Sequence, residues 1–264
     1  MTSHELSGKR ALVTGASSGL GADFARQLAA FGTNLVLVAR RADRMEQLKA
    51  EIEKSHAVEI DVIPMDLLAE GAPRRLYDDL AARGRTIDVL INNAGYGMHG
   101  PFLKQDWARQ EAMLRLDMLV LTELTKLFLP GMVARNYGHV LQVSSAIAYQ
   151  PAPTYAAYAA AKSYVLFFGE ALAFELRKTA VNCTVLSPGI TATEFLDVAG
   201  QKPTLYQRLF MMQSDAVVRT GLKAMLARRP SVIPGFGNTL LAFGVRFIPR
   251  RAITRIAYFL MKYG

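Results

Sequence analysis

Short apolar runs alternate with longer amphipathic segments through most of this 264-residue chain, and this alternation limits the possible folds more than any other feature. The apolar runs, which we predict to be strands, are residues 9–15, 33–39, 58–66, 88–95, 139–145 and 181–189. The segments between and after them that we predict to be helices are residues 20–31, 42–55, 69–84, 106–134 and 155–178. Strands that alternate with helices build βαβ units with right-handed crossovers. Because the runs are apolar on both faces, the sequence predicts an α/β fold with a doubly wound, mainly parallel sheet between helices.

The charge of the chain is unevenly distributed. The formal net charge is +9, yet the residues from Gly200 onward hold 11 Lys/Arg and one acidic residue, Asp215, so the rest is near neutral. A basic segment can bind nucleic acid, an anionic membrane or an acidic partner; we expect no nucleic-acid partner. The single cysteine, Cys183, excludes a disulfide framework, and the four histidines lack ligand spacing, so no metal site is expected.

No targeting segment is visible in the first ten residues, which lack an apolar run. No stretch reaches 18 uninterrupted apolar residues, so we expect no membrane-spanning helix. These features indicate a cytoplasmic protein.

The segment TGASSGLG, residues 14–21, joins the first predicted strand to the first predicted helix. Glycine permits positive φ angles and lets backbone N–H groups approach a pyrophosphate at a helix N-terminus. A plain tight turn would also use Gly15, Gly19 and Gly21. Their position after the first strand of a doubly wound sheet favours dinucleotide binding.

Two arginines, Arg40 and Arg41, follow the second predicted strand, where sites for NAD carry a carboxylate that accepts the ribose 2′-OH. Guanidinium groups pair well with phosphate oxygens, so arginine at this place suits the 2′-phosphate of NADP. A solvated charge pair at a helix start would look the same in the sequence. We predict NADP(H), with Arg40 ahead of Arg41 as its ligand.

Polar residues also follow the third and fourth predicted strands. Asp66 either hydrogen-bonds the adenine edge or caps the next helix, and both alternatives remain open. Asn92-Asn93-Ala94-Gly95 leaves room for a ribose, although a simple turn would have similar residues.

The catalytic candidates are Ser145, Tyr158 and Lys162. Tyr158 and Lys162 are separated by four residues and therefore share one helix face. A lysine ammonium beside a phenol lowers the pKa of the tyrosine, which makes it a usable general acid or base. Ser145 ends the preceding strand, where its hydroxyl can donate to a substrate carbonyl. A Tyr/Lys pair at this spacing also occurs by chance on helix surfaces.

The motifs TGASSGLG, NNAG, YAAAK and PGITAT (residues 188–193) occur in this order, with a serine 13 residues before the tyrosine. In this combination the chain resembles the short-chain dehydrogenase/reductase family over about residues 7–200, most of all its DltE-like bacterial branch. The resemblance implies a Rossmann-type sheet of about seven strands and an NADP-dependent enzyme that interconverts a carbonyl and an alcohol. It also implies that Ser145 polarises the carbonyl, that Tyr158 transfers the proton, and that Lys162 holds the nicotinamide ribose.

The resemblance extends to residues that line the cofactor, with Thr193 expected to contact the nicotinamide amide. The predicted cofactor site comprises Gly15, Ser17, Ser18, Gly19, Leu20, Gly21, Arg40, Arg41, Asp66, Leu67, Asn93, Ala94, Gly95, Tyr158, Lys162, Pro188, Gly189, Thr191 and Thr193. A dinucleotide-binding regulatory or membrane-tethered protein with little turnover is the alternative, but such a protein would not need all three catalytic candidates.

Asp117 departs from the family pattern, which has an asparagine 28 residues before the catalytic serine. In the family, that residue helps to hold a water near the lysine, largely through its main chain. A carboxylate at Asp117 either keeps this water or pairs with Lys162 directly. We include Asp117 among the catalytic candidates.

We expect the whole chain to form one domain. Residues 1–199 are its dinucleotide-binding and catalytic part, and residues 200–264 form a substrate loop and a basic, apolar helical extension. The family forms dimers or tetramers through two long central helices, so a homo-oligomer is expected. The loop after the last predicted strand favours an apolar substrate through Phe195, Leu196, Leu205, Tyr206, Leu209 and Phe210.

The end of the chain has an amphipathic pattern. Residues 238–248 are apolar almost all round, with Arg246 as the one charged residue, and a helical stripe follows Pro249. The stripe comprises Ile253, Ile256, Ala257 and Leu260, and the opposite face comprises Arg251, Arg255, Tyr258 and Lys262. This pattern is typical of an interfacial helix on anionic lipid, but also of a helix that packs on its own domain or on a partner subunit. We predict peripheral contact with the inner face of a membrane through residues 238–264.

Overall fold

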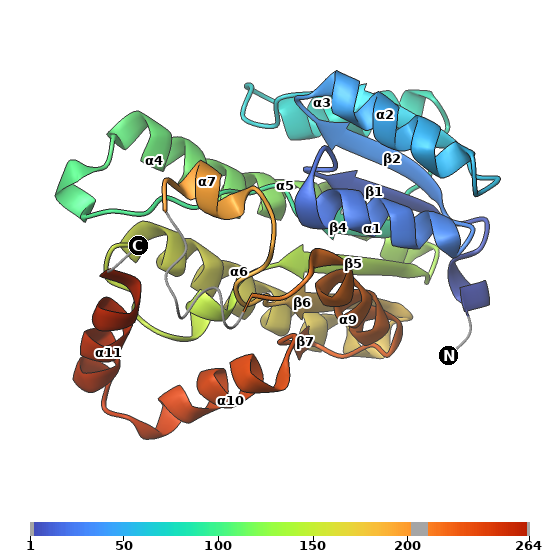
Figure 1. The fold of residues 1–264 in the computed structure, drawn as a ribbon. Helices are drawn as coiled ribbons and strands as arrows, with labels where there is room; N and C mark the ends of the chain where they lie inside the picture. Colours follow the sequence, from blue (N-terminus) through green and yellow to red (C-terminus); the bar gives the residue numbers. More distant parts are fainter. Residues whose placement is uncertain (1–2, 202–210, 263–264) are drawn as a thin grey trace.

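A seven-stranded, all-parallel sheet forms the centre of the structure, a computed structural model that describes residues 3–201 and 211–262. The strands are β1 (Arg10–Thr14), β2 (Asn34–Ala39), β3 (Ile60–Pro64), β4 (Val89–Asn92), β5 (Gly138–Val143), β6 (Val181–Leu186) and β7 (Ser231–Val232). Their order is β3-β2-β1-β4-β5-β6-β7 (Figure 1). The predicted doubly wound parallel sheet is thereby confirmed.

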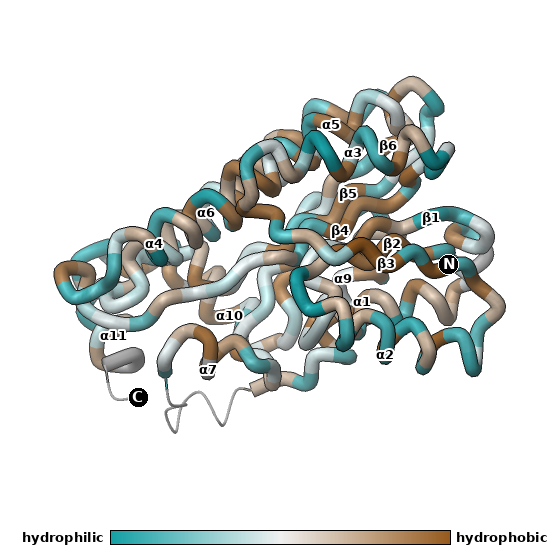
Figure 2. The backbone as a smooth tube through the Cα atoms, turned by 90° about the horizontal axis from the view of Figure 1, so that it is seen from above, coloured by the Kyte–Doolittle hydropathy of each residue, from teal (hydrophilic) through white to brown (hydrophobic). Residues whose placement is uncertain are grey.

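Helices cover both faces of this sheet (Figure 2). One face carries α1 (Gly19–Ala30), α2 (Ala42–Glu53) and α9 (Ser214–Leu226), and the other carries α3 (Ala72–Ala82), α5 (Leu121–Ala134) and α6 (Ala156–Glu175). Successive side chains of a strand point to opposite faces. In β2, Leu35 and Leu37 therefore enter the core under α1, whereas Val36 and Val38 enter the core on the other face. This explains why the strands are apolar throughout.

The long predicted helix at 106–134 is one continuous helical stretch with a change of winding in its middle. It comprises α4 (Trp107–Leu114), the π-helical segment η3 (Arg115–Val120) and α5. Asp106 caps its start, since its side chain accepts a hydrogen bond from the backbone N–H of Arg109. The η3 segment contains Asp117, and π-helical turns often mark functional sites.

The part of the chain after residue 200 also contributes to the sheet and to the helices that cover it. It supplies β7, which pairs with β6, and α9, which packs against α1. The last two helices, α10 (Phe236–Gly244) and α11 (Arg250–Lys262), lie away from the sheet at the lower left of Figure 1. Among the described residues, none of the helices has the length and apolarity needed to span a bilayer.

The strand order reverses direction between β1 and β4, and this reversal positions the site. Ligands of open parallel sheets bind at the carboxyl ends of the strands beside such a reversal. The segments that leave these ends are the glycine-rich loop after β1, the Asn93–Gly95 turn after β4 and the loop after β5. The last contains the short 3-10 helix η4 (Ala146–Tyr149).

Candidate active site

The glycine-rich loop closes tightly onto the start of α1. A Cβ atom at Gly21 would overlap the carbonyl oxygen of Gly15, so only glycine permits this close approach. Ser18 precedes α1 without a side-chain cap, because its hydroxyl accepts a 2.7 Å hydrogen bond from Arg41 instead. The first N–H groups of α1 therefore have no side-chain partner from Ser18. They are suited to a pyrophosphate, the group that helix N-termini bind in dinucleotide sites.

Arg40 and Arg41 have different surroundings. Arg41 donates to the hydroxyls of Ser17 and Ser18, and its guanidinium lies 3.1 Å from the Glu194 carboxylate. Arg40 is exposed, lines the same cavity and forms no ion pair with the described residues. Arg40 is thus the cation without a carboxylate partner, whereas Arg41 already joins the glycine-rich loop to Glu194.

Glu194 was not among the predicted site residues, and it connects two distant parts of the chain. It follows Thr193 in the loop after β6, and its carboxylate pairs with Arg41 and, at 2.6 Å, with Arg44 of α2. Hydrogen bonds from these two guanidiniums lower the pKa of Glu194 to about 2. The start of the substrate loop is therefore attached to the predicted 2′-phosphate region.

Asp66 does not cap the following helix, so one of the two predicted alternatives is wrong. Its side chain accepts from the backbone N–H of Leu68 within a turn, and Gly71 occupies the N-cap position of α3. Asp66 and the buried Leu67 both line the cavity, which leaves the adenine alternative as a prediction.

Asn93 holds the end of β4 against the end of β1. Its side-chain amide donates to the carbonyl oxygen of Thr14 at 2.8 Å, and its backbone N–H donates to the Thr14 hydroxyl at 3.0 Å. Gly95 lies beyond this turn, where a Cβ atom would collide with the Asp117 carboxylate and lie 3.2 Å from the Lys162 ammonium. The small residue thus lets the turn pass directly over the Asp117–Lys162 pair.

The structure brings Ser145, Tyr158 and Lys162 to one wall of the cavity. Ser145 caps η4 after β5 and accepts a hydrogen bond from the Ile147 N–H. Tyr158 and Lys162 project from the same side of α6 and are both buried. The Lys162 ammonium donates to the Val143 carbonyl oxygen at 3.2 Å and lies 5.7 Å from the centre of the Tyr158 ring.

Asp117 pairs directly with Lys162, which distinguishes between the two alternatives for this residue. The carboxylate and the ammonium are 3.3 Å apart, and Asp117 also accepts from the Tyr96 N–H. Complete burial raises the pKa of Asp117, and the Lys162 ammonium opposes this rise. Asp117 lies behind Lys162 and does not line the cavity itself.

The predicted lowering of the Tyr158 pKa is wrong for this arrangement. Burial raises the pKa of the Tyr158 phenol well above its usual range, the Asp117 carboxylate raises it further, and a hydrogen bond with Ser145 acts in the opposite direction. The main physical reason is burial, which disfavours the charged phenolate, and the nearby Asp117 carboxylate adds to it.

A cavity of about 810 Å³ extends from the glycine-rich loop to the catalytic group. Every predicted site residue lines it except Gly21 and Asp117. Pro188, Gly189, Thr191 and Thr193 form the wall after β6, and the Pro188 carbonyl oxygen accepts from the Ala146 N–H at 2.7 Å. The lining of the cavity, the uncapped α1 start and Arg40, which forms no ion pair within the described part of the chain, together fit a nicotinamide dinucleotide.

Further residues line the cavity that the sequence patterns did not identify. They are mainly apolar or aromatic and include Tyr96, Arg109, Leu116, Tyr149, Gln150, Val198, Asn238, Leu241 and Ala242. Phe195 and Leu196 were predicted, and the Phe195 ring lies 5.4 Å from that of Tyr158. Leu205, Tyr206, Leu209 and Phe210 lie outside the described residues.

Known proteins resemble this chain in sequence and structure. A family model described as short chain dehydrogenase matches residues 9–203. Very-long-chain 3-oxoacyl-CoA reductase of Homo sapiens is 33% identical over 202 residues, which are 75% of this chain but only 64% of the length of that protein. A short chain dehydrogenase of Pseudocercospora fijiensis is 32% identical over 228 residues, 82% of this chain and 72% of that protein. The structure of a short-chain dehydrogenase from Sphingobium yanoikuyae in complex with NADPH is 29% identical, with a TM-score of 0.82 over 90% of this chain and 92% of that one.

Proposed function

This chain belongs to the short-chain dehydrogenase family of oxidoreductases, and from that premise we propose that it interconverts a carbonyl and an alcohol with NADP(H). The observation that carries the proposal is the convergence of Ser145, Tyr158 and Lys162 on one wall of the cavity that also holds the glycine-rich loop. In this arrangement a bound nicotinamide supplies or accepts the hydride.

The side chains supply the hydrogen bond and the proton that reduction of a carbonyl needs in addition to the hydride. During reduction, the Ser145 hydroxyl donates a hydrogen bond to the carbonyl oxygen, and the Tyr158 phenol gives that oxygen its proton. The Lys162 ammonium, close to the Tyr158 ring, holds a ribose of the cofactor. The Asp117 carboxylate fixes the position of this ammonium at the base of the site. The reverse reaction needs the Tyr158 phenolate, which a raised pKa makes scarce at neutral pH.

The preference for NADP(H) is supported by the absence of a carboxylate at the end of β2, where Arg40 and Arg41 stand. Arg40 has no carboxylate partner among the described residues, so its charge remains available for a 2′-phosphate. The similar structure from Sphingobium yanoikuyae is a complex with NADPH.

The substrate that we propose is a largely apolar carbonyl or alcohol. The cavity beyond Tyr158 is lined by Phe195, Leu196, Ile147 and Leu241, with Gln150 and Arg109 as polar exceptions. A relative of this chain is named for reduction of very-long-chain 3-oxoacyl-CoA, a molecule with a long apolar portion.

The test is NADPH consumption by the full chain across aldehydes, long-chain ketones, steroid ketones and 3-oxoacyl thioesters. We expect turnover of at least one apolar class, and none in the Tyr158→Phe variant with the same compound. Tight NADPH binding without turnover of any carbonyl or alcohol would contradict the proposal and favour a dinucleotide-binding regulatory protein.

A further inference from the structure

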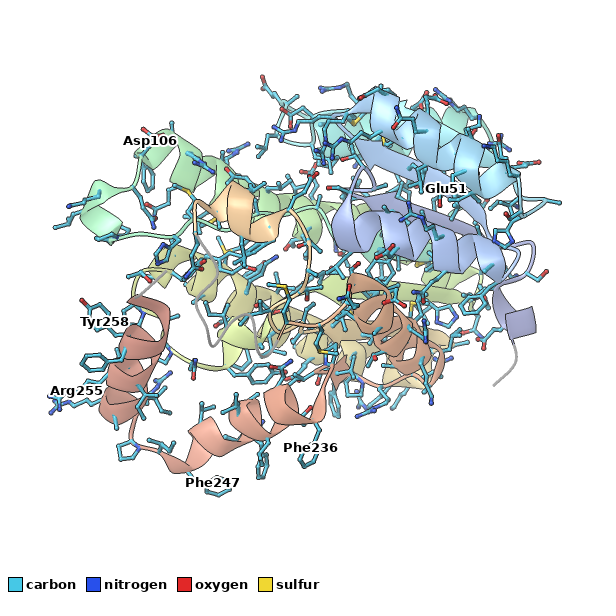
Figure 3. All side chains as sticks on the ribbon, viewed as in Figure 1. Glu51, Asp106, Phe236, Phe247, Arg255 and Tyr258 are labelled. Atoms are coloured by element: carbon cyan, nitrogen blue, oxygen red, sulfur yellow. The ribbon has the colours of Figure 1, made fainter. Side chains whose placement is uncertain are left out.

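The helices α10 and α11 present an exposed apolar surface with arginines around it. On α10 and the following 3-10 turn η6 (Val245–Phe247), the spacing of Phe236, Leu240, Phe243 and Phe247 places them on one helical face. Phe236 is 85% exposed and Phe247 is 75% exposed. Both side chains extend from the helix away from the body of the molecule (Figure 3). An isolated exposed apolar residue needs no explanation, but a contiguous aromatic stripe indicates a binding surface.

The opposite face of α10 belongs to the active-site cavity. Asn238, Leu241 and Ala242 line that cavity, and Asn238 packs directly against Gly189 of the loop after β6. The outward orientation of the stripe is therefore fixed by the contacts of the inner face. One helix thus separates the cavity from the exposed surface.

The helix α11 divides its apolar residues between two faces, which corrects the single predicted stripe. Ile253 and Ala257 are buried against the domain, as expected for a packing helix, whereas Ile256 and Phe259 are exposed. The side chain of Leu260 lies outside the described part of the chain. The burial of this pair holds α11 in place and leaves Ile256 and Phe259 on its exposed side.

All the charges on this surface have the same sign. Residues 236–262 contain four arginines and one lysine, and no acidic residue follows Asp215 in the sequence. Arg251 and Arg255 are exposed on α11, where Arg255 extends outward (Figure 3). The Arg246 guanidinium lies 5.7 Å from the centre of the Phe243 ring, so charge and aromatic area alternate over short distances.

We propose that the α10–α11 surface docks on a bilayer that contains anionic phospholipid. Aromatic and aliphatic groups enter the interface between head groups and acyl chains, while arginines bind the phosphates above them. A second copy of the chain fits this surface less well. A two-fold interface would place the same arginines against each other without a carboxylate to neutralise them. The proposal stands apart from the proposed reaction, and it places one wall of the cavity beside the lipid.

The experiment is flotation of the full chain with vesicles of phosphatidylcholine alone or with 30% phosphatidylglycerol. We expect flotation with the anionic vesicles at low salt, and its loss with neutral vesicles or at 0.5 M salt. Arg251→Gln with Arg255→Gln should lower the vesicle partition coefficient about 30-fold, from ~1 kcal/mol for each basic group near anionic lipid. Phe236→Ser with Phe247→Ser should lower it at least tenfold. Neither pair lines the cavity.

Matched controls carry equal changes elsewhere on the surface. Arg177→Gln with Lys178→Gln removes the same charge beside α6, and Phe102→Ser with Leu103→Ser removes exposed apolar groups from the 3-10 turn η2 (Phe102–Lys104). Both should float like the unmodified chain.

No flotation of the full chain, or equal losses in the controls, would overturn the proposal. A lower oligomer mass of the Phe236/Phe247 variant without a change in flotation would instead make this surface a contact between copies. Flotation reports lipid binding alone, so its failure leaves the proposed oxidoreductase activity untouched.

Discussion

Burial raises the pKa of the Tyr158 phenol most, and the buried Asp117 carboxylate, paired with Lys162, raises it further because it disfavours a second negative charge on the nearby phenol. Asp117→Asn removes that charge and also frees the Lys162 ammonium to act on the phenol. Both effects lower the pKa of Tyr158. We therefore expect the rising limb of alcohol oxidation, plotted against pH, to move to lower pH in this variant. The measurement is kcat against pH. Glu123→Gln on the surface of α5 is the control with an equal charge change, and an unshifted Asp117→Asn profile would contradict this role.

Tyr158 is the proposed proton donor, and its contribution is separable from cofactor binding. Tyr158→Phe removes the hydroxyl but keeps the ring against Phe195. We expect kcat to fall by ~10²–10⁴-fold, the usual contribution of a general acid. The NADPH dissociation constant, measured by fluorescence titration, should stay within about threefold of the original value. Near-normal turnover would assign the proton transfer to another group.

Arg40 is the proposed ligand of the 2′-phosphate. Arg40→Asp removes a charge-assisted contact and adds repulsion, so the ratio of kcat/KM for NADPH to that for NADH should fall roughly tenfold or more, from ~1.5–3 kcal/mol per such contact. The matched variant is Arg74→Asp on α3, which should keep the ratio. An unchanged ratio in Arg40→Asp would transfer the role to Arg41.

At the scale of residues, the sequence predicted those site residues whose positions follow from a strand end or from helical spacing. The glycines, the Tyr158/Lys162 pair and Asn93 all line or support the cavity because each follows a strand end or shares a helix face. Glu194 and Arg109 had no such signal. Glu194 accepts from Arg44 of α2, and Arg109 of α4 donates to the Val198 carbonyl oxygen of α7. These segments meet only in the folded chain. The pKa of Tyr158 was misjudged because the sequence showed neither the burial of the phenol nor the Asp117 carboxylate close to it.

At the scale of elements, the strands were predicted well where apolar runs are long. The bounds of β1, β2, β5 and β6 agree with the predicted runs within three residues at either end. The strand β7 has only two residues, too short for any periodicity, and α9 was not predicted. The π-helical segment η3 has no signal in the sequence either, since the same apolar spacing continues through it.

The ion pairs of Glu194 connect two elements, the start of α2 and the loop that leads into α7 (Phe195–Ala199). A 2′-phosphate at Arg41 would compete with this carboxylate. Glu194→Gln should therefore tighten NADPH binding roughly two- to fivefold, the range expected for exposed ion pairs, and leave NADH binding unchanged. Dissociation constants for both cofactors test this, with Glu53→Gln at the far end of α2 as the control. Weaker NADPH binding would instead mean that Glu194 holds the site in shape.

At the scale of the whole molecule, two of the exposed apolar surfaces formed by the described residues are large enough to bind a partner or a membrane. The sequence indicated the basic end of the chain but assigned Ile253 and Ile256 to one stripe, because helical periodicity alone does not say which side of a helix meets the domain. The second surface is formed by α6 and η3, where Leu119, Phe167 and Phe174 are exposed. Its residues were read in the sequence as parts of two long central helices, without a distinction between core and surface.

We propose that this second surface, defined by Leu119, Tyr164, Phe167 and Phe174, joins copies of the chain into a dimer or tetramer. Tyr164 and Phe167 are separated by three residues, and Phe174 follows two turns later, so they share one side of α6. A hydrogen bond of 2.9 Å between the Tyr164 and Thr122 hydroxyls brings this side next to Leu119. The Arg177 guanidinium lies 3.9 Å from the centre of the Phe174 ring, and the other three side chains of the surface are uncharged, so a two-fold contact here brings together mainly apolar groups.

Phe167→Asp with Phe174→Asp should break this contact, because two buried carboxylates on each copy would face one another without a partner. We expect sedimentation velocity to show a dimer or tetramer of the unmodified chain and a monomer of this variant. Phe236→Asp with Phe247→Asp carries the same change on the other exposed surface and should keep the oligomer. Far-UV circular dichroism and NADPH binding establish that both variants are folded, since none of the four substituted residues lines the active-site cavity. If the oligomer persists with the α6 substitutions and dissociates with those at Phe236 and Phe247, the surface of α10 joins the copies and the surface of α6 does not.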